Sequence, residues 1–586
     1  MLRKSYFIVL ILIILGGIFL RVYPFQSKSW IGDYDTQVVG QALDIGKGIS
    51  GRDFSLAFQN VKYPYLIPYL LFISYGIFYF IGLLTGLFSS SEQFVNYIFS
   101  HLDQFYWQSR LLIAFWGIAI FILTYLIVRQ IFLKNKNSSL GALLACFFSA
   151  FSLLGIQFSQ QVRPHIPVAF FILLSYYFYL LFLEKKTKLL FFLLAGSASL
   201  AIGTFMSGIF ALVFLPLANY FIFQSKKQFK ILSFLKSFFS FKFVAGVLLF
   251  LSLTLLFYPH IFLGLQAQMK KAQTGISVSL LGVRFSIHSL GFGFTTIFKV
   301  LFLHETALGV LLIIFLFIFL FRKKKKIKNN YYYQAIVGWW VFVLSFGLSF
   351  GLIDNGWRYR AILPLLAFLY IGLAILFVNI LSLILNKKII ISLIVFFLCL
   401  HTVQAFRLVR LISRSYTIEQ ANEWIEKNID LDKVIIFQKL FTKIIPNKES
   451  IKKQIDLAGD AGRKEEFLLS LSDEEYPLGS RSIARFDYLM DAYNGDILKG
   501  YKAIQEMKPD YFIISSRSLE ERKQGYYPEY QIANFHGRLI KKFSPFKNEK
   551  NKKSLNFPSG FGNPLIDLWQ AKQLGPGIEI YKLKWD

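Results

Sequence analysis

Long apolar segments alternate with short polar or basic ones over the first two thirds of the chain. An apolar run of about 20 residues is long enough to cross a bilayer as one α-helix. The pattern predicts eleven such spans, near residues 6–22, 109–132, 139–159, 166–183, 188–205, 208–224, 242–262, 295–321, 334–352, 360–385 and 388–406. The centres of these spans are nearly free of charge, as is typical of a polytopic α-helical membrane protein.

Basic residues gather at alternate ends of the expected spans. Cytoplasmic loops are enriched in Lys and Arg, and neighbouring clusters here are separated by two spans, so one orientation places all of them in the cytoplasm. The clusters are Lys134/Lys136, Lys185/Lys186/Lys188, Lys226/Lys227/Lys230, Arg322 to Lys326 with Lys328, and Lys387/Lys388. In this orientation the N-terminus is cytoplasmic and the C-terminal part of the chain lies outside.

The N-terminus resembles a signal peptide, because Met1-Leu2-Arg3-Lys4 precedes an apolar run. A signal peptide ends at a small-residue cleavage site. Here Arg21-Val22-Tyr23-Pro24 follows instead. We therefore expect the first span to be retained.

A twelfth apolar stretch, Tyr63 to Phe88, does not fit the alternation. If the segment crossed the membrane once, five Lys-rich loops would lie outside, against the orientation rule. We expect instead a helix that lies at, or dips into, the outer interface, where its tyrosines are at home. The alternative is a true span with inverted topology after it.

The composition agrees with a membrane protein and excludes several other classes. The 586 residues are 55% hydrophobic and 18% aromatic, and their mean hydropathy is +0.50. The net charge of +30 comes from Lys clusters between apolar runs, which indicates orientation signals and contact with an anionic lipid bilayer. We expect no nucleic-acid partner, since no base-stacking or basic-helix module is present. Two cysteines give no disulfide framework and no zinc site.

The chain changes character after about residue 407, where charges of both signs become frequent. Thr417 to Ile425 has the pattern of an amphipathic helix, and Lys433 to Phe437 and Asp510 to Ile514 have that of buried strands. We predict a transmembrane domain at 1–406, with a first outer loop at 23–108, and a soluble extracytoplasmic α/β domain at 407–586. No catalytic motif occurs in the latter, so recognition or covering of the membrane site is its expected use.

Two carboxylates two positions apart, Asp33 and Asp35, follow the first span on its outer side. Such a pair can accept a proton or hold a divalent cation. Charged groups beside lipid are costly unless they are used. The alternative is a hydrated turn, because Gly-Asp-Tyr-Asp also has turn chemistry.

Three further outer segments carry cations or a metal-ligating side chain. Gln160 to His165 contains Arg163, which suits a phosphate, and His165, which can ligate a metal or transfer a proton. Arg358 and Arg360 precede a late span and could clamp a lipid-linked phosphate. Lys62 opens the interfacial segment. Interfacial anchoring is the alternative for these residues.

A fourth outer loop, 263–294, is basic on the side where the orientation rule expects few cations. It contains Lys270, Lys271, Arg284 and His288. We expect Lys270, Arg284 and His288 to contact an anionic donor or the acceptor. A solvated loop is the alternative.

The order of these features resembles a known superfamily. A first span, a loop that opens with Asp33, an interfacial helix with Pro64 near its start, two spans and an Arg-containing outer loop look like the GT-C membrane glycosyltransferases. The chain is most similar to the branch of protein O-mannosyltransferases and aminoarabinose transferases, which is glycosyltransferase family 39-like. Trp357 to Pro364 looks like that branch's Arg-Tyr…Pro element, and Thr417 to Ile425 like the helix that opens its tail.

The resemblance implies a GT-C-like fold and an inverting transfer of a sugar from a polyprenyl-phosphate donor to a hydroxyl acceptor. The acceptor would be a protein, a lipid or a glycan at the extracytoplasmic face of the cell membrane. Asp33 would be the general base, with Asp35 beside it. The donor phosphate would be bound by Lys62, Arg163, Arg358 and Arg360, since stabilisation of the departing phosphate matters most.

The chain departs from that branch at three places, which leaves the role of a metal open. Asp33 is followed by Tyr34 and Asp35, where the branch often has Asp-Glu. His165 and Lys62 stand where an acidic residue and a metal-binding side chain are common. A divalent metal held by Asp33, Asp35 and His165 is one expectation, and a metal-free phosphate site at Lys62 is the other.

Two other function classes remain. A transporter or flippase of lipid-linked sugars would show ionisable residues in mid-span, broken helices and internal repeats. A scaffold protein that acts through its tail would be insensitive to replacement of Asp33.

Overall fold

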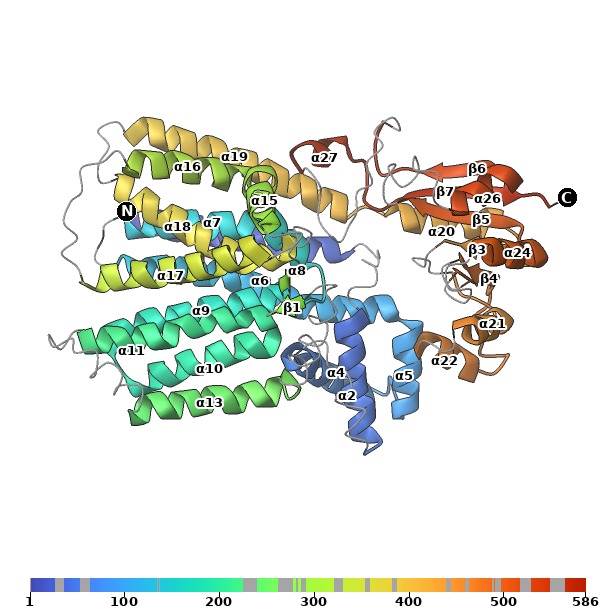
Figure 1. Cartoon of the computed structure of the whole chain (residues 1–586), viewed down its shortest axis with the longest axis horizontal. Helices are drawn as coiled ribbons and strands as arrows, with labels where there is room; N and C mark the ends of the chain where they lie inside the picture. The colour runs from blue at the N-terminus through green and yellow to red at the C-terminus, as the bar shows by residue number, and fades with distance from the viewer. Residues whose placement is uncertain are drawn as a thin grey trace. The chain divides into compact units, whose positions relative to one another are not determined.

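The computed structural model describes residues 2–26, 36–52, 64–133, 135, 137–224, 240–261, 278–280, 283–285, 291–320, 330–353, 359–381, 387–438, 444–458, 463–486, 489–490, 497–516, 528–548 and 564–585. The chain forms two compact units (Figure 1). The membrane unit comprises Met1–Phe25, Asp33–Ser91 and Gln104–Val409, and the C-terminal unit comprises Arg410–Asp586 with Gln26–Gly32 and Glu92–Asp103.

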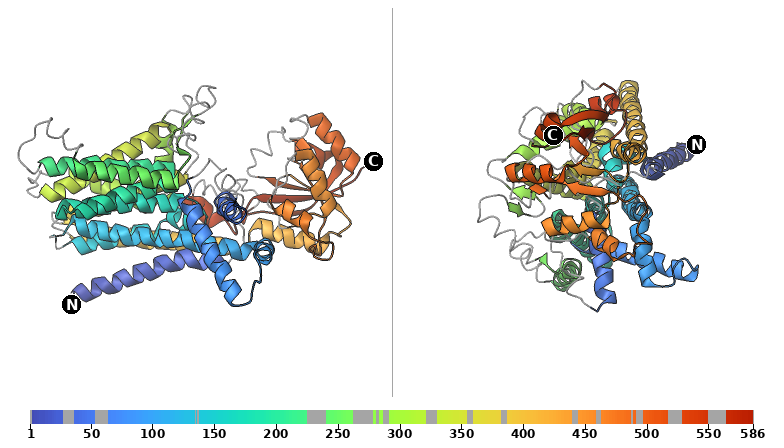
Figure 2. Two further views of the ribbon diagram at one scale, coloured as in Figure 1. Left: turned by 90° about the horizontal axis from the view of Figure 1, so that it is seen from below. Right: turned by 90° about the vertical axis from the view of Figure 1, so that its right-hand side faces the viewer.

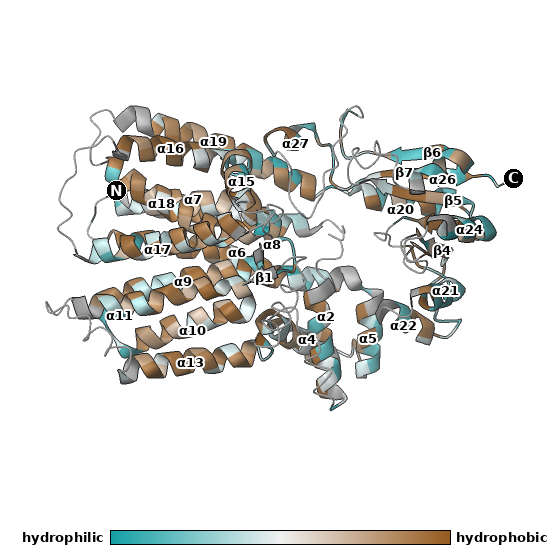
Figure 3. Cartoon of the chain, in the orientation of Figure 1, coloured by the Kyte–Doolittle hydropathy of each residue, from teal (hydrophilic) through white to brown (hydrophobic). Residues whose placement is uncertain are grey.

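Apolar helices make up the membrane unit. They are α1 (Leu2–Val22), α2 (Thr36–Ser50), α4 (Leu66–Leu84), α6 (Leu102–Ile131), α7 (Ser138–Phe151), α8 (Leu153–Ser159), α9 (His165–Lys185), α10 (Lys188–Thr204), η2 (Met206–Val213), α11 (Phe214–Gln224), α13 (Phe241–Phe257), α15 (Phe292–Lys299), η4 (Val300–His304), α16 (Thr306–Leu320), α17 (Asn330–Ile353), η5 (Tyr359–Ile362), α18 (Leu363–Leu381) and α19 (Lys387–Ile412). Figure 3 shows that apolar residues dominate them.

Length and hydropathy confirm a polytopic helical membrane protein. Within the described residues, 7 helices are long and apolar enough to cross a membrane, or up to 9 if each bent pair counts as one span. The shorter apolar helices Lys188–Thr204, Met206–Phe221 and Phe243–Phe257 occupy three more of the expected segments. Every predicted span therefore falls on a helix or a bent pair of helices.

Buried aromatic side chains fill the centre of the membrane unit. The rings of Phe342 and Phe368 stack with centroids 4.0 Å apart, and Tyr176 packs against both Phe214 and Phe368. The polar atoms of this cluster are satisfied by backbone: Tyr176 donates to Ala335 O (2.8 Å). Burial of such rings without unpaired polar groups stabilises α9, α17 and α18 against one another.

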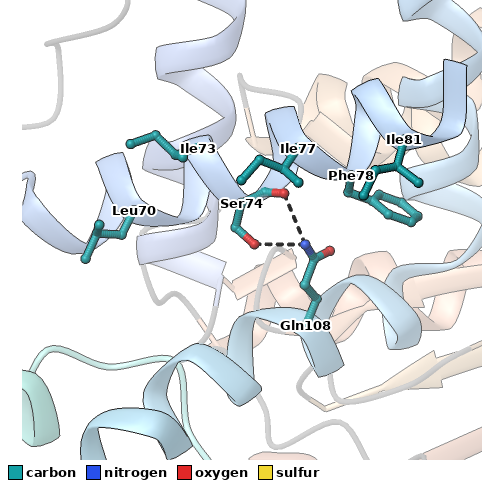
Figure 4. A pocket seen from close by; sticks show the side chains of 7 residues that line it. All are labelled: Leu70, Ile73, Ser74, Ile77, Phe78, Ile81 and Gln108. Atoms are coloured by element: carbon teal, nitrogen blue, oxygen red, sulfur yellow. Dashed lines mark hydrogen bonds between the residues drawn. The ribbon is translucent and has the colours of Figure 1, made fainter. Parts of the chain in front are cut away.

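Helix α4 lies in the stretch that we predicted to be interfacial, and it is one of the 7 helices that are long and apolar enough to cross a membrane. Figure 1 shows α4 nearly end-on, whereas α9, α10 and α13 lie in the plane of the view, and Figure 2 shows α4 crossing their direction. Tyr75 Oη and Ser109 Oγ are 2.6 Å apart, which joins α4 to α6. Gln108 of α6 donates to Ser74 O (3.2 Å) and Oγ (2.8 Å) beside a shallow apolar groove of about 300 Å³ (Figure 4).

The C-terminal unit is an α/β domain. Its elements are α5 (Ser91–Ser100), α20 (Thr417–Asn428), β3 (Val434–Phe437), α21 (Lys448–Ala458), α22 (Arg463–Ser470), β4 (Ser482–Arg485), α24 (Ile497–Met507), β5 (Tyr511–Ser516), α26 (Pro528–His536), β6 (Gly537–Phe543), α27 (Pro564–Gln570) and β7 (Gly577–Leu583). The predicted helix and both predicted strands are confirmed as α20, β3 and β5.

The strands form one mixed sheet in the order β4-β3-β5-β7-β6. Strand β3 runs parallel to β4 and β5, and β7 runs antiparallel to β5 and β6. Ile436 and Phe512 point into an apolar cluster on one face, and Ile435 and Ile513 into another. Because successive strand residues point to opposite faces, uninterrupted apolar strands signal a sheet that is covered on both sides.

Arg481 is a buried arginine within this unit. Its guanidinium donates to Asp430 O (2.8 Å) and, at 3.5 Å, to Ile425 O and Glu426 O at the end of α20. The last carbonyls of a helix have no partner within the helix. Arg481 therefore caps the C-terminus of α20.

Candidate functional site

The segment predicted as the span 139–159 is a broken helix. Helices α7 and α8 meet at Ser152 with a bend of 51°, where Ser152 has extended backbone angles (φ −52°, ψ 124°). A break leaves carbonyls without partners at the end of one half and N–H groups without partners at the start of the other. In an apolar bundle both sets need polar partners from elsewhere.

Arg21 of α1 supplies the partners for the end of α7. Its guanidinium donates to Ala150 O (2.6 Å), Ser149 O (3.1 Å) and, within α1, Gly17 O (3.1 Å). The side chain is 1% exposed and lies over the ring of Phe121, 5.1 Å from its centroid. A cation at a helix C-terminus also complements the negative end of the helix dipole.

Glu305 supplies the partner for the start of α8. Its Oε1 accepts from Ser152 Oγ (2.8 Å) and Leu154 N (3.2 Å), while Ser152 Oγ accepts from Gly155 N (2.9 Å). Its Oε2 lies 3.4 Å from His401 Nε2 of α19, and both side chains are fully buried. Glu305 itself stands at a second break, where η4 and α16 meet with a bend of 105°.

Two glycines allow α1, α6 and α8 to approach one another at the break. A Cβ on Gly117 of α6 would lie 2.3 Å from Ser159 Oγ and 3.0 Å from Arg21 Nε. A Cβ on Gly155 would lie 3.3 Å from Arg21 Nη2. Small residues permit such close helix contacts in membrane proteins.

The loop with Arg163 and His165 comes directly after α8. Gln160 Nε2 donates to Arg21 O (2.6 Å), so the loop is attached to the end of α1. Arg163 and His165 are buried, and the ring of His165 meets Phe205 edge-on with centroids 4.8 Å apart. Arg163 N donates to Gln161 O (2.8 Å). A buried arginine beside a helix end is suited to bind an anion that enters from the water-facing end of the helices.

The element that contains Arg360 lies near the same loop. Helix α8 contacts η5, and the rings of His304 and Tyr359 lie 4.8 Å apart. Arg360 is half-buried in η5. The structure thus brings together α8 with the loop after it, η5 with Arg360, the end of η4, and the end of α1. These four segments define the candidate site.

The described residues include only part of the predicted constellation. Arg163, His165 and Arg360 are placed, and Arg284 lies in β2 (Val283–Phe285), where it pairs with Ser279 of β1 (Val278–Leu280). The remaining predicted site residues lie outside the described residues: Asp33, Asp35, Lys62, Lys270, His288 and Arg358.

Three ionisable residues stand in or at the end of predicted spans, whose centres we expected to be nearly free of charge. Glu305 lies within the predicted span 295–321, His401 within 388–406, and Arg21 within 6–22, and all three are buried. Each is an ionisable residue inside an apolar run, which by itself marks a site or a structural partner. That signal was available in the sequence, but the meeting of Arg21 and Glu305 at the α7–α8 break was not.

No metal site is complete within the described ranges. In the part of the chain that the structure describes, no three His, Cys, Asp or Glu side chains come together. His165 has the ring of Phe205 beside it. The other two predicted metal ligands, Asp33 and Asp35, fall outside those ranges, and metal dependence stays a prediction.

A small cavity lies at the break. Arg21, Ser149, Ser152, Gly155 and Tyr370 are among its lining residues, and its volume of about 20 Å³ is that of roughly one water molecule. A sugar does not fit into it. The cavity belongs to the packing of the break.

Several solved structures are similar to this one. The Archaeoglobus fulgidus oligosaccharyltransferase in its apo form matches at a TM-score of 0.42 and 13% identity, over 92% of this chain and 73% of that chain. Apo ArnT from Cupriavidus metallidurans matches at 0.45 and 10%, over 90% and 95%. The mycobacterial arabinofuranosyltransferase AftD matches at 0.41 and 12%, over 100% and 40%. No protein-family model and no curated protein sequence matches the chain. We transfer no residue role from these proteins.

Proposed function

We propose that the protein is a membrane glycosyltransferase of the GT-C type, which moves a sugar from a polyprenyl-phosphate donor to a hydroxyl acceptor outside the cytoplasm. The observation that carries the proposal is the meeting of α8, which leads into the loop with Arg163, with η5, which contains Arg360, and with the end of α1. The acidic pair Asp33 and Asp35 follows that end of α1 in the sequence.

The chemistry of an inverting transfer needs two things from the protein. The acceptor oxygen attacks the anomeric carbon from the face opposite the phosphate, and the bond from that carbon to the phosphate oxygen breaks. The electron pair leaves with the polyprenyl phosphate, and the hydroxyl proton goes to a base. In our proposal Asp33 is that base, and Asp35 is the second candidate.

Arg163 and Arg360 neutralise the charge on the departing phosphate in this mechanism. Stabilisation of developing charge in a site with little water is a large contribution to catalysis. Arginine suits the role because its planar group binds two phosphate oxygens at once. Lys62 and Arg358 join them as donor ligands, and the 263–294 loop with Lys270, Arg284 and His288 contacts the donor or the acceptor.

A transporter of lipid-linked sugars is the second candidate, because the α7–α8 break is a feature of such proteins. In transporters the ends of broken helices point at the substrate. Here Arg21 and Glu305 of the same chain already bind those ends, and the cavity beside Arg21 and Ser152 has room for about one water molecule. The break therefore favours the transferase.

The test is sugar transfer by the purified protein in lipid, with a panel of labelled polyprenyl-phosphate sugars and mixed hydroxyl acceptors. We expect transfer by the wild type and a loss of about 100-fold or more in Asp33→Asn, as for removal of a general base. Asp35→Asn serves as the matched comparison, because it changes the neighbouring carboxylate in the same way.

The outcomes separate the candidates. Loss in Asp35→Asn alone would move the base to Asp35 and keep the enzyme. Flipping of labelled donor across vesicles without any transfer would replace the transferase by the transporter.

A further inference from the structure

We infer that Arg21 and Glu305 are positioning residues, which hold the candidate site in place by binding the two halves of the broken helix. Neither residue was among the site residues expected from the sequence. The inference rests on the proposed function for its kinetic part, and on the structure of the break alone for its structural part.

The hydrogen-bonding groups of the two residues match the two helix ends that they bind. Arg21 donates to Ala150 O and Ser149 O at the C-terminal end of α7. Glu305 accepts from Leu154 N and Ser152 Oγ at the N-terminal end of α8. The last carbonyls of a helix lack donors and its first N–H groups lack acceptors, and these two side chains supply them. The two side chains together fix the direction in which α8 leaves the break.

That direction matters because the loop after α8 contains the phosphate-binding candidate. Helix α8 has only 7 residues, so any rotation at Ser152 moves the loop with Arg163. Ser159 Oγ donates to Gly155 O (2.6 Å), which makes the short helix a rigid unit.

Arg21 also binds the segment that follows α8, through its backbone oxygen. Its backbone oxygen accepts from Gln160 Nε2 (2.6 Å), while its side chain binds α7. The same residue therefore fixes the end of α1 relative to the loop.

Glu305 extends the contact to two more helices. Glu305 directly precedes α16, and its Oε1 binds the start of α8. Its Oε2 lies 3.4 Å from His401 Nε2 of α19. The break is thus held from three helices other than its own: α1, α16 and α19.

Four variants test the inference by steady-state transfer in lipid. Arg21→Met removes the donors to Ser149 and Ala150, and we expect kcat to fall by about 10- to 100-fold with a smaller change in KM, because misplaced groups lose mainly transition-state stabilisation. Arg21→Lys restores a donor, but a single ammonium group replaces the planar fork, so we expect partial recovery.

The two Glu305 variants separate positioning from acid–base chemistry. Glu305→Gln keeps an oxygen that can accept from Ser152 and Leu154, and we expect it to retain at least a third of kcat. Glu305→Leu removes the acceptor, and we expect the loss seen with Arg21→Met. If Glu305→Gln were as inactive as Glu305→Leu, a proton-transfer role would replace positioning.

Hydrogen exchange provides the readout that does not depend on transfer. We expect faster amide exchange at residues 153–163 in Arg21→Met and Glu305→Leu, with no change in α9. Arg481→Met is the matched control: it removes another buried arginine that caps a helix, and exchange at 153–163 should not change. Unchanged exchange in Arg21→Met would overturn the inference even if the transferase is correct.

Failure of the proposed function leaves a different pattern. A wild type that transfers no sugar, with faster exchange at 153–163 in the variants, would remove the transferase and keep the positioning. Lower yield of folded Arg21→Met, with normal kcat per folded molecule and normal exchange, would make Arg21 only a stability residue.

Discussion

Arg21 in the membrane unit and Arg481 in the C-terminal unit bind helix ends in the same way, but the two helix ends lead into different kinds of segment. Both arginines are buried, 1% and 3% exposed, and both donate to carbonyls at the end of a helix. Arg481 binds the end of α20, where the chain continues into the sheet strand β3. Arg21 binds a break, after which a 7-residue helix leads to a candidate phosphate ligand.

Hydrogen bonds from a buried arginine to a helix end therefore contribute stability in the C-terminal unit, whereas in the membrane unit they set the direction of α8. A helix end in a folded core must be capped, whatever its function. A break within an apolar helix is needed only if the chain must change direction there. The cost of providing Arg21 and Glu305 in apolar surroundings therefore indicates that the direction of α8 is important.

The largest expected effect is that of replacing Arg163, the candidate phosphate ligand in the loop after α8. Arg163→Ala should lower kcat by about 100-fold or more, because a charge-stabilising donor is lost from the site. Arg163→Lys should recover part of the rate. Transfer assays in lipid give the measurement, and Arg129→Ala, near the end of α6 where Arg129 hydrogen-bonds Ser139, is the control. Equal rates for Arg163→Ala and wild type would take Arg163 out of the site.

Arg481→Met should show the purely structural side of the comparison. Three carbonyls would lose a donor, and we expect the C-terminal unit to lose about 2 kcal/mol of stability. The rate of transfer per folded molecule should not change. Denaturant titration followed by near-ultraviolet circular dichroism gives the first value and the transfer assay the second. A lower rate per folded molecule would mean that both arginines act on the site.

Gly117→Ala tests the close contact of α6 with Ser159 of α8 and with Arg21 of α1. The new methyl group would overlap Ser159 Oγ and press on Arg21, at a cost of about 1–2 kcal/mol. Gly76→Ala in α4 is the matched control, since its Cβ meets nothing within 4 Å. Thermal unfolding of both variants in detergent measures the difference. Equal melting temperatures would show that α6 moves aside freely.

The smallest effect belongs to an exposed ion pair of the C-terminal unit. Lys448 donates to Asp473 Oδ1 (2.6 Å), and this hydrogen bond holds the pKa of Asp473 below its ordinary value. A lowered folded-state pKa stabilises the fold above about pH 4 and loses that effect as the pH falls through the folded pKa. Asp473→Asn should melt slightly below wild type at pH 7. The two proteins should melt alike at pH values below the folded pKa of Asp473, and a persistent difference there would assign the effect to something other than charge.

The sequence was sufficient for elements that local pattern determines. The run 166–183 became α9, and the apolar strands after residue 430 became β3 and β5, because length, hydropathy and alternation are read within one segment. The break at Ser152 was not predictable in this way, since Phe151 and Leu153 continue the apolar run on both sides. It depends on Arg21 and Glu305, two partners that lie far from it in the sequence.

The candidate site was predictable in part. The loop with Arg163 and His165 stood out because charged and polar residues follow a long apolar run. The contact of the preceding helix α8 with η5, and the attachment to α1 through Gln160, required the three-dimensional arrangement. The contacts of Asp33 and Asp35 remain predictions from the sequence.

Strand β6 has a consequence for how copies of this protein meet. It forms an edge of the sheet, it exposes Arg538 and Lys541, and its pairing with β7 is irregular between Leu539 and Lys541. Positive charge and irregularity on an edge strand prevent the sheets of two molecules from joining edge to edge. Membrane proteins diffuse in two dimensions and collide often, so an edge strand that disfavours pairing matters more here than it would for a protein in dilute solution.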